Sequence, residues 1–582
     1  MIKTRIIALA LSAAIAGCGD ATDTDQATAG GNGVKPAPSN PADMVFTGSH
    51  ILTMDSAQPR AEAVAIDDGK IVFVGDKAGV NDLVGEQTRV VELGDQALIP
   101  GLIDAHGHFM MMARLADVVQ LYPPPVGKVD SIDALVTTLK NKLESDPPKE
   151  GQWFAGFGYD DSLLAEERHP TRQELDLVST DIPIAIMHVS GHLCTVNTKA
   201  LELLGMGPDT KEPAGGVIRR EAGSNMPNGV LEETASHPVM YKLFAGDAND
   251  GFRAKVEKAV ELYASMGITT MQDGASNFQD IERMRSVTAD NPLSLDLAFY
   301  PQIMNFDDAK LDAFRHEPTY NNGLRVAGIK FLLDGSPQGR TAWMTHAYDE
   351  LPDGAEEGYV AYPAYDPELY KSQLATVMHN GVPILAHANG DAAIDAMLDG
   401  VEAAFPEGDI PDHRAVIIHA QLMRRDQLDR SLALGAIPSF FSAHTFFWGD
   451  WHRRSFGEER ASGISPTGSA IEKGLRFTTH NDAPVVLPDM MRLLWATVNR
   501  TTRSGHVLGR GERITPEQAL KSMTIDAAYQ YFEEDVKGSL TVGKQADLVI
   551  LGADPTEADP DTLADIAIVE TIAHGKTVFS AN

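Results

Sequence analysis

Both ends of the chain alternate apolar and polar residues with a period of two. Near the N-terminus the alternating segments are MVFTGSHILTMD, AEAVAIDDGKIVFVGD and RVVELGDQALIP, and near the C-terminus they are GSLTVGKQADLVILGADP and IAIVETIAHGKTVFSAN. This period, interrupted by turn signals such as DDG and GD, predicts antiparallel strands. Neither end has enough strands to form a core alone. We therefore expect residues 44–98 and 536–582 to form one small composite β-sandwich.

The middle of the chain instead alternates short apolar runs with segments able to form helices, a pattern that favours a parallel sheet. The runs are ALIPGLIDAHGH, GITTMQDGA, LSLDLAFYP, LRVAGIKFLLDGS, VPILAHANGD, AVIIHAQ, AIPSFFSAH and RFTTHNDAPV. Eight such units predict an α/β fold, a (β/α)₈ TIM-type barrel over residues 99–535.

The first and second apolar runs are separated by residues 109–266, far more than an ordinary connection between a strand and a helix. This stretch includes the apolar segment IPIAIMHVSGHLCTVN. We therefore predict an insertion with secondary structure of its own that covers the mouth of the barrel.

The N-terminal segment carries two positive charges and then an apolar run over Ile6–Ala16. Spanning a bilayer takes about 20 residues, so this run fits a secretory signal peptide better than a transmembrane helix. Its end, IAGC, resembles a bacterial lipobox, which implies cleavage after residues 1–17 and a lipid anchor on Cys18. Residues 18–43 are polar and rich in Gly, Ala and Pro, as in a flexible tether. The prediction is an exported, lipid-anchored protein facing the periplasm or the cell surface; an ordinary signal peptide is the alternative.

The composition limits which partners and which kinds of metal site this chain can have. The 582 residues include 48 Lys and Arg against 82 Asp and Glu, a net charge of −34. A nucleic-acid partner needs a basic surface, so we exclude one. The only two cysteines, Cys18 and Cys194, exclude a disulfide scaffold and a cysteine-rich metal cluster. We expect Cys194 to be a packed thiol, and any metal site to use His, Asp, Glu or Lys.

Five of the eight apolar runs contain a candidate metal ligand at or near their ends. In the first run, His106 and His108 are two residues apart in an extended segment and so point to the same side. The remaining candidates, one each in the fourth, fifth, sixth and eighth runs, are Lys330, His387, His419 and Asp482. Taken singly, each has an ordinary alternative: a core histidine, a lysine that reaches solvent, or an aspartate that caps a turn. Together they indicate one metal site, because the C-terminal ends of barrel strands share one mouth and unpaired buried polar groups are costly.

The order His-x-His, Lys, His, His, Asp, with strands at both chain ends, resembles the amidohydrolase superfamily. The segments PGLIDAHGH, SGHLCTVNTKAL, IKFLLDGSPQGRTA, LAHANGDAAID, VIIHAQ and NDAPV resemble its amidohydrolase family 3 branch, which includes N-substituted formamide deformylase-like enzymes. The resemblance runs from about Met44 to the C-terminus.

This resemblance implies a metal-dependent hydrolase that cleaves a C–N bond (amide, N-formyl or N-acyl) with metal-activated water. It implies a carboxylated Lys330 between two ions, with Asp482 shuttling the proton. The implied ligands are His106, His108 and Asp482 on one ion, and His387 and His419 on the other. An unmodified lysine would leave a mononuclear site. Zinc is the first expectation, and manganese or iron would also suit these ligands.

By the same resemblance, the SGH and DGSPQGRTA segments border the substrate. The substrate-binding candidates are His192, Asn197, Arg340 and Trp343. Alternatively, the first two brace the insertion and Arg340 pairs with an acid such as Asp334. The aromatic run Phe446–Trp448 predicts a hydrophobic rim and a bulky or aryl amide.

Other functions remain open at this stage. A deaminase or cyclic-amide hydrolase, or a lactone or phosphoester hydrolase, would use the same ligands. A non-catalytic surface lipoprotein is disfavoured because all six ligand positions are filled. The expected partner is a small molecule, with membrane contact only through the Cys18 anchor. The sequence predicts neither the substrate nor the oligomeric state.

Overall fold

The computed structural model describes residues 41–191, 193–213, 216–244, 249–352 and 355–581. The predicted signal peptide, the anchor at Cys18 and almost all of the tether lie outside the described residues. No helix in the described ranges is both long and apolar enough to cross a membrane.

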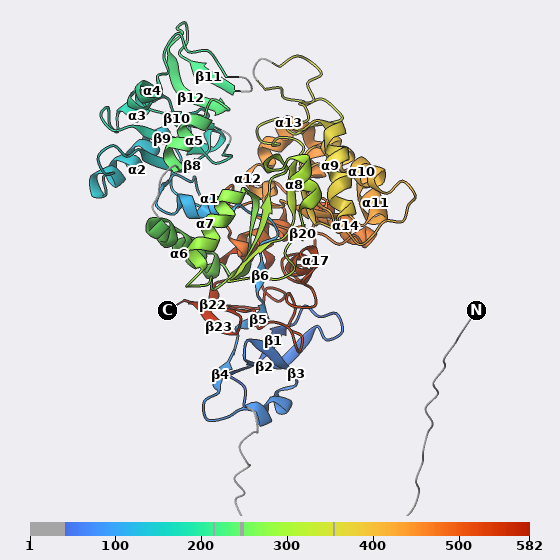
Figure 1. Ribbon diagram of the computed structural model, residues 1–582. Coiled ribbons are helices and arrows are strands. Elements are labelled where there is room, and N and C mark those ends of the chain that lie inside the picture. Colours follow the sequence, from blue (N-terminus) through green and yellow to red (C-terminus); the bar gives the residue numbers. More distant parts are fainter. Residues whose placement is uncertain (1–40, 192, 214–215, 245–248, 353–354, 582) are drawn as a thin grey trace, which may run out of the picture.

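Strands from both chain ends share one eight-stranded sheet, coloured blue and red in Figure 1. Along it lie β23 (Lys576–Ser580), β22 (Ile568–Ala573), β21 (Leu548–Leu551), β5 (Ala97–Pro100), β1 (Met44–Leu52), β2 (Arg60–Asp67) and β3 (Lys70–Gly75), while β4 (Arg89–Glu92) also pairs with β1. The two ends meet where β21 runs antiparallel to β5, with Leu98 opposite Ile550. A shared core containing Phe46, Leu98 and Leu548 holds the sheet together.

The eight apolar runs of the middle form two parallel sheets. One contains β6 (Leu102–Ile103), β13 (Ile268–Ser276), β14 (Asp296–Pro301) and β15 (Leu324–Val326) in spatial order. The other contains β16 (Ile329–Leu332), β17 (Ile384–Ala388), β18 (Val416–His419), β19 (Ile437–Phe440) and β20 (Thr478–Thr479). The fourth run supplies both β15 and β16. The fold is therefore mixed α/β with sequential parallel strands, while a closed barrel stays a prediction.

Backbone contacts link these two sheets at both edges. Gln302, just after β14, forms a parallel bridge with Lys330 of β16. At the opposite edge, His108 N donates to Ala483 O at 2.7 Å and Asp482 N donates to His106 O at 3.2 Å. The segments that follow β6 and β20 therefore lie side by side.

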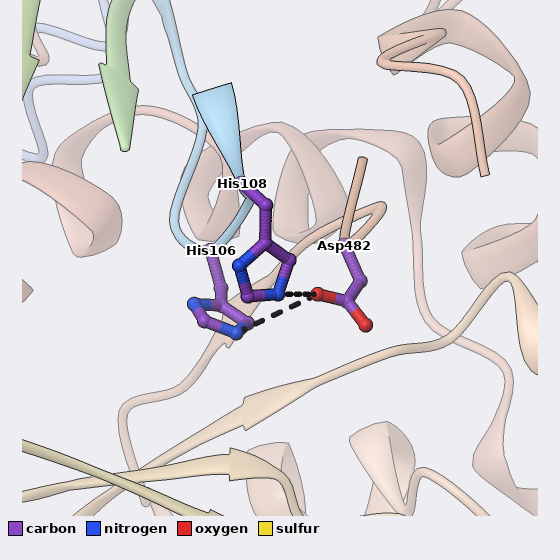
Figure 2. Close-up of side chains that lie close together, drawn as sticks. All are labelled: His106, His108 and Asp482. Atoms are coloured by element: carbon purple, nitrogen blue, oxygen red, sulfur yellow. Dashed lines mark ion pairs between the residues drawn. The ribbon is translucent and has the colours of Figure 1, made fainter. Parts of the chain in front are cut away.

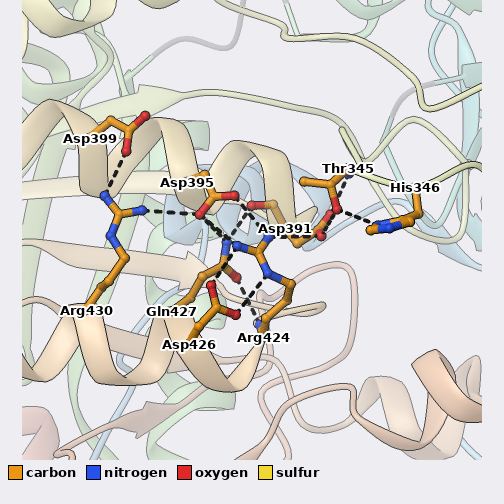
Figure 3. Close-up of polar contacts among 9 residues, drawn as sticks. All are labelled: Thr345, His346, Asp391, Asp395, Asp399, Arg424, Asp426, Gln427 and Arg430. Carbon is orange, nitrogen blue, oxygen red and sulfur yellow. Dashed lines mark hydrogen bonds and ion pairs between the residues drawn. The ribbon is translucent and has the colours of Figure 1, made fainter.

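The helices that follow β17 and β18 are tied together by a network of charged side chains (Figure 3). These are α10 (Asp391–Ala404) and α11 (Arg425–Leu434). Arg424, at the start of α11, forms ion pairs with Asp391 and Asp395 at 3.1 and 3.0 Å. Arg430 reaches Asp395 and Asp399 at 3.3 and 2.7 Å. The network therefore holds together the starts of the two helices that follow His387 and His419 in the chain.

The remaining helices of the central region connect or flank the strands. They are α7 (Phe278–Thr288), α8 (Asp308–Ala313), α9 (Pro367–His379), α12 (His444–Phe447), α13 (Gly449–Ser462), α14 (Thr467–Lys473), α15 (Met490–Asn499), α16 (Pro516–Ser522) and α17 (Ile525–Gln530).

The stretch between β6 and β13 has a sheet of its own, with the strand order β11-β12-β10-β9-β8-β7. The strands are β7 (Val119–Gln120), β8 (Phe154–Tyr159), β9 (Ile184–His188), β10 (Leu193–Val196), β11 (Gly216–Arg220) and β12 (Pro227–Glu233). Its helices are α1 (Phe109–Leu115), α2 (Ile132–Ser145), α3 (Arg172–Asp176), α4 (Thr198–Leu204), α5 (His237–Phe244) and α6 (Asn249–Ser265). Its contacts with the ends of the central strands include hydrogen bonds from Trp448 Nε1 to Asp160 at 3.2 Å, from Tyr122 Oη to Pro484 O at 3.0 Å and from Met110 N to Asp273 at 3.0 Å.

A buried ion pair joins the central strands to the C-terminal segment. Asp296, the first residue of β14, lies 2.5 Å from Lys537 Nζ, and the side chains are 2% and 1% exposed. His574, in the turn between β22 and β23, contacts the same carboxylate at 3.2 Å. Burial alone would raise the pKa of Asp296, but the Lys537 charge lowers it well below its ordinary value.

We expect Lys537→Met to lower the apparent Tm, because it leaves the Asp296 carboxylate buried without its cation, at a cost of about 3–5 kcal/mol. The double variant with Asp296→Asn should recover much of the loss. Since the folded-state pKa of Asp296 lies below its unfolded value, this stabilisation exists above about pH 4 and disappears as the pH falls further. Thermal unfolding of the full chain at several pH values measures both effects, and an unchanged Tm for Lys537→Met would contradict this interpretation.

Candidate metal centre

Three of the predicted ligands meet where β6 and β20 end (Figure 2). Asp482 Oδ1 lies 3.1 Å from His108 Nε2 and 3.5 Å from His106 Nε2. The backbone hydrogen bonds between these two segments hold them in this register. His106 and His108 point to the same side because they alternate along an extended segment.

The other three predicted ligands lie around this group. Lys330 Nζ is 3.0 Å from His106 Nε2. His419 Nε2 is 4.0 Å from Asp482 Oδ2, and the His387 and His419 ring centroids are 4.6 Å apart. The structure thus brings all six residues, drawn from five strand ends, into one cluster.

Burial sets the protonation of the cluster. It lowers the pKa of both His106 and His419 well below the usual histidine range, so the imidazoles are neutral. It also lowers the pKa of Lys330 to about 7. For Asp482, burial alone would raise the pKa, but His108, whose Nε2 lies 3.1 Å from Oδ1, keeps the pKa below its ordinary value. Neutral imidazole and ionised carboxylate are the forms that bind metals.

Two of these residues have an unusual backbone conformation. His419 has a φ of 74° and Asp482 a φ of 55°. Non-glycine residues rarely adopt this left-handed region, at a cost of order 1–3 kcal/mol, and such residues concentrate at functional sites. The surrounding structure therefore holds both side chains in place against a local preference.

The donor set fits a divalent cation. Ligand atoms of His106, His108 and Asp482 all lie within 4.8 Å of one another. Asp482 Oδ1 is buried and accepts no well-aligned hydrogen bond from the described part of the chain. Two imidazole nitrogens and a carboxylate oxygen around one space are ligands that suit zinc, and manganese or iron as well.

Three side chains that the sequence analysis did not select as site residues contact the ligands. Gln272 contacts His106, Asp334 contacts His387, and His480 contacts His419. Gln272 lies in the second apolar run and His480 two residues before Asp482. Applying the strand-end criterion to every polar residue type would have found these two.

Asn197 is removed from the substrate-binding candidates. Its Oδ1 accepts hydrogen bonds from Ile184 N and Ala200 N, both at 3.0 Å. Its Nδ2 donates to Ser179 O and Ile182 O at 2.8 and 2.9 Å. Because these bonds occupy the amide inside the insertion, Asn197 braces that region, as the alternative interpretation held.

Arg340 is also engaged elsewhere. Its Nη2 donates to Glu350 at 2.6 Å, and its guanidinium lies 4.4 Å from the centre of the Trp451 ring. The acid it pairs with is therefore Glu350, not Asp334, and we withdraw it as a substrate ligand. Trp343 is half-buried, and its backbone N–H donates a hydrogen bond to the Asp334 carboxylate. It stays a substrate-binding candidate. His192 lies outside the described residues.

The sequence matches a family described as "Amidohydrolase family" over residues 89–579. The chain belongs to this family. It is 27% identical to N-substituted formamide deformylase of Arthrobacter pascens, covering 92% of this chain and 97% of that protein. It is 23% identical to the putative amidohydrolase YtcJ of Bacillus subtilis, covering 92% and 99%.

Solved structures show the same fold. An uncharacterized metal-dependent hydrolase from Pyrococcus horikoshii has a TM-score of 0.70 at 23% identity, covering 89% of this chain and 99% of its own. A zinc-bound adenosine deaminase from Xanthomonas campestris has a TM-score of 0.51 at 14% identity, covering 93% and 94%. This amidohydrolase-family member therefore shares the fold of metal-dependent hydrolases and has a group of candidate metal ligands.

We predict that His106→Ala weakens zinc binding by more than about 100-fold, beyond the 10–100-fold typical of residues that only support a ligand. Elemental analysis and competition with a chromophoric chelator measure this. His346→Ala, which removes an exposed histidine outside the cluster, is the control and should bind like the unaltered chain. Equal metal content in both variants would contradict the assignment of His106.

Proposed function

We propose that this protein hydrolyses the C–N bond of a small-molecule amide, N-formyl or N-acyl compound with a metal-activated water. The observation that carries the proposal is the convergence of six potential ligands at the ends of parallel strands. The relative named N-substituted formamide deformylase, matched over 92% of this chain, supports the choice of bond. We also propose that the two parallel sheets close into a (β/α)₈ barrel, which their contacts at both edges support.

The proposed centre holds two divalent ions, most simply zinc. His106, His108 and Asp482 would hold one, and His387 and His419 the other, with carboxylated Lys330 between them. Such ions supply Lewis acidity, which activates water and polarises a carbonyl group.

Lys330 is suited to carboxylation. Its Nζ is buried 3.0 Å from His106 Nε2, and burial lowers its pKa to about 7, so much of the amine is uncharged near neutral pH. The uncharged nitrogen adds to the carbon of CO2 and releases one proton, giving a carbamate. The carbamate replaces an ammonium, which cannot bind a cation, with two anionic oxygens.

Asp482 is the proposed proton carrier. The carboxylate is ionised, and its Oδ1 faces the His106 and His108 side chains without a well-aligned hydrogen bond. Asp482 would take a proton from the attacking water and deliver it to the leaving nitrogen. The side chains of His108 and Asp482 remain 25% and 11% exposed, so the centre is open on this side.

A small apolar cavity lies next to the Asp482 segment. Val485, in its wall, donates its backbone N–H to Asp482 O at 2.8 Å. The lining is almost wholly apolar and includes Tyr122, Val189 and Trp448. We propose that this apolar lining contacts a bulky or aryl substituent of the amide.

The carboxylation of Lys330 has its own test. Native mass spectrometry of the metal-loaded chain should show an added CO2 that acid removes, and Lys330→Ala should lack it. Restoring bicarbonate to acid-treated and neutralised protein should restore the adduct. One bound ion together with an unmodified lysine would contradict the two-ion centre.

The reaction is tested with formyl, acetyl and aryl amides, measuring both products. We expect equal amounts of acid and amine, faster turnover when the substituent is apolar, and a loss of about 10²–10⁴-fold in kcat for Asp482→Asn. Asp426→Asn, which alters an exposed carboxylate, serves as the control and should retain activity. Ammonia released without acid would favour the deaminase interpretation, and undiminished turnover in Asp482→Asn would remove its assigned role.

A further inference from the structure

Three of the candidate ligand imidazoles each have a buried polar side chain within hydrogen-bond distance of Nδ1. A neutral imidazole carries one proton, and the hydrogen bond at one nitrogen decides which nitrogen has it. The partners of His106, His387 and His419 at Nδ1 therefore determine which ring nitrogen carries the proton.

The Gln272 amide fixes His106. Its Nε2 lies 2.9 Å from Ala105 O and 2.6 Å from Tyr531 Oη, which itself donates to Asp104 O at 2.7 Å. A backbone carbonyl only accepts, so this end of the amide must be the NH2 group. Its oxygen therefore faces His106 Nδ1, at 2.6 Å, and accepts that proton. His106 Nε2 is left as a lone pair.

The Asp334 carboxylate fixes the tautomer of His387, again with the proton at Nδ1. Oδ1 lies 3.0 Å from His387 Nδ1 and accepts from Asn389 N at 3.0 Å. Oδ2 accepts from Gly390 N and Trp343 N at 2.8 and 3.1 Å. Gly390 is the N-cap of α10, and a helix N-terminus stabilises a negative charge. Because both oxygens already accept backbone N–H bonds, we infer that His387 Nδ1 donates to Oδ1, and its Nε2, 3.3 Å from Asn389 Nδ2, is left to accept.

His480 is the side chain that contacts Nδ1 of His419. Its Nε2 lies 3.1 Å from His419 Nδ1, and its Nδ1 lies 2.9 Å from Ser439 Oγ. All three side chains are buried. His419 Nε2 faces Asp482, and it presents a lone pair there when protons run from His419 Nδ1 to His480 Nε2 and from His480 Nδ1 to Ser439 Oγ.

We propose that Gln272, Asp334 and His480 are positioning residues, each of which fixes the tautomer and ring orientation of one ligand imidazole before an ion binds; at His106 and His419 this leaves Nε2 unprotonated toward the cluster. The inference rests on the proposed function. Without the acceptor, the imidazole would distribute between two tautomers and two ring orientations, and metal binding would have to select one of them. Comparable supporting residues change metal affinity by about 10–100-fold.

The first experiment determines the tautomers of the unaltered chain, and variants serve only to assign its signals. In the metal-free full chain with ¹⁵N-labelled histidine, NMR signals assigned by single His→Gln replacements should show the Nδ1–H tautomer for His106, His387 and His419. An Nε2–H tautomer at His106 or His387 would overturn the proposal.

The second experiment compares matched variants for zinc affinity and tautomer. His480→Phe keeps a ring but removes the acceptor, so we expect about a 10–100-fold weaker zinc affinity and mixed tautomers at His419. His480→Gln can accept at one end and donate at the other, and should restore most of both. Gln272→Met tests His106 independently, and thermal unfolding checks that each variant is folded.

The outcomes separate this inference from the proposed function. Wild-type tautomers and affinity in both His480→Phe and Gln272→Met would overturn the positioning role. If His480→Phe does not fold, Gln272→Met and the wild-type tautomers decide. A chain that binds zinc as expected but releases no acid from amides would overturn the proposed function alone, whereas a wild-type chain that binds no metal would overturn both.

Discussion

The candidate metal centre depends on backbone hydrogen bonds between the first and last strand ends of the central region. His108 N bonds to Ala483 O and Asp482 N to His106 O, at 2.7 and 3.2 Å. These bonds connect residues more than half the chain apart, and they place the Asp482 carboxylate between two imidazoles. Asp482 keeps this place with a left-handed backbone, so the register of the two segments outweighs a local conformational preference.

Burying the polar groups of the centre costs little free energy because most of them have a hydrogen-bond partner. Asp334 is 1% exposed and Gln272 is fully buried, and each would be costly without hydrogen bonds. Both side chains form hydrogen bonds with backbone groups and with a ligand imidazole. Asp482 Oδ1 is among the buried atoms without a hydrogen-bond partner in the described part of the chain, and it lies where a cation would satisfy it.

The sequence alone predicted which side chains lie together, because their signal is local: an apolar strand that ends in His, Lys or Asp is recognisable in a few residues. That they bind metal stays a prediction. The two chain ends were expected to form one composite β-sandwich, because neither end has enough strands alone; their strands do share one sheet, and the sandwich itself stays a prediction. Supporting contacts were harder, since they depend on tertiary placement. Arg340 was expected near substrate or Asp334, but its acid is Glu350 across a loop, and nothing in the residue types distinguishes those partners.

The insertion and the candidate centre are coupled through one short segment. Tyr122 of the insertion donates a hydrogen bond to Pro484 O, and Val485 donates to Asp482 O. Both Tyr122 and Val485 also line the apolar cavity. A substituent in contact with this lining would therefore touch residues that also hold the Asp482 backbone, so the insertion and the Asp482 segment share the residues at which the proposed substrate contact and the carboxylate meet.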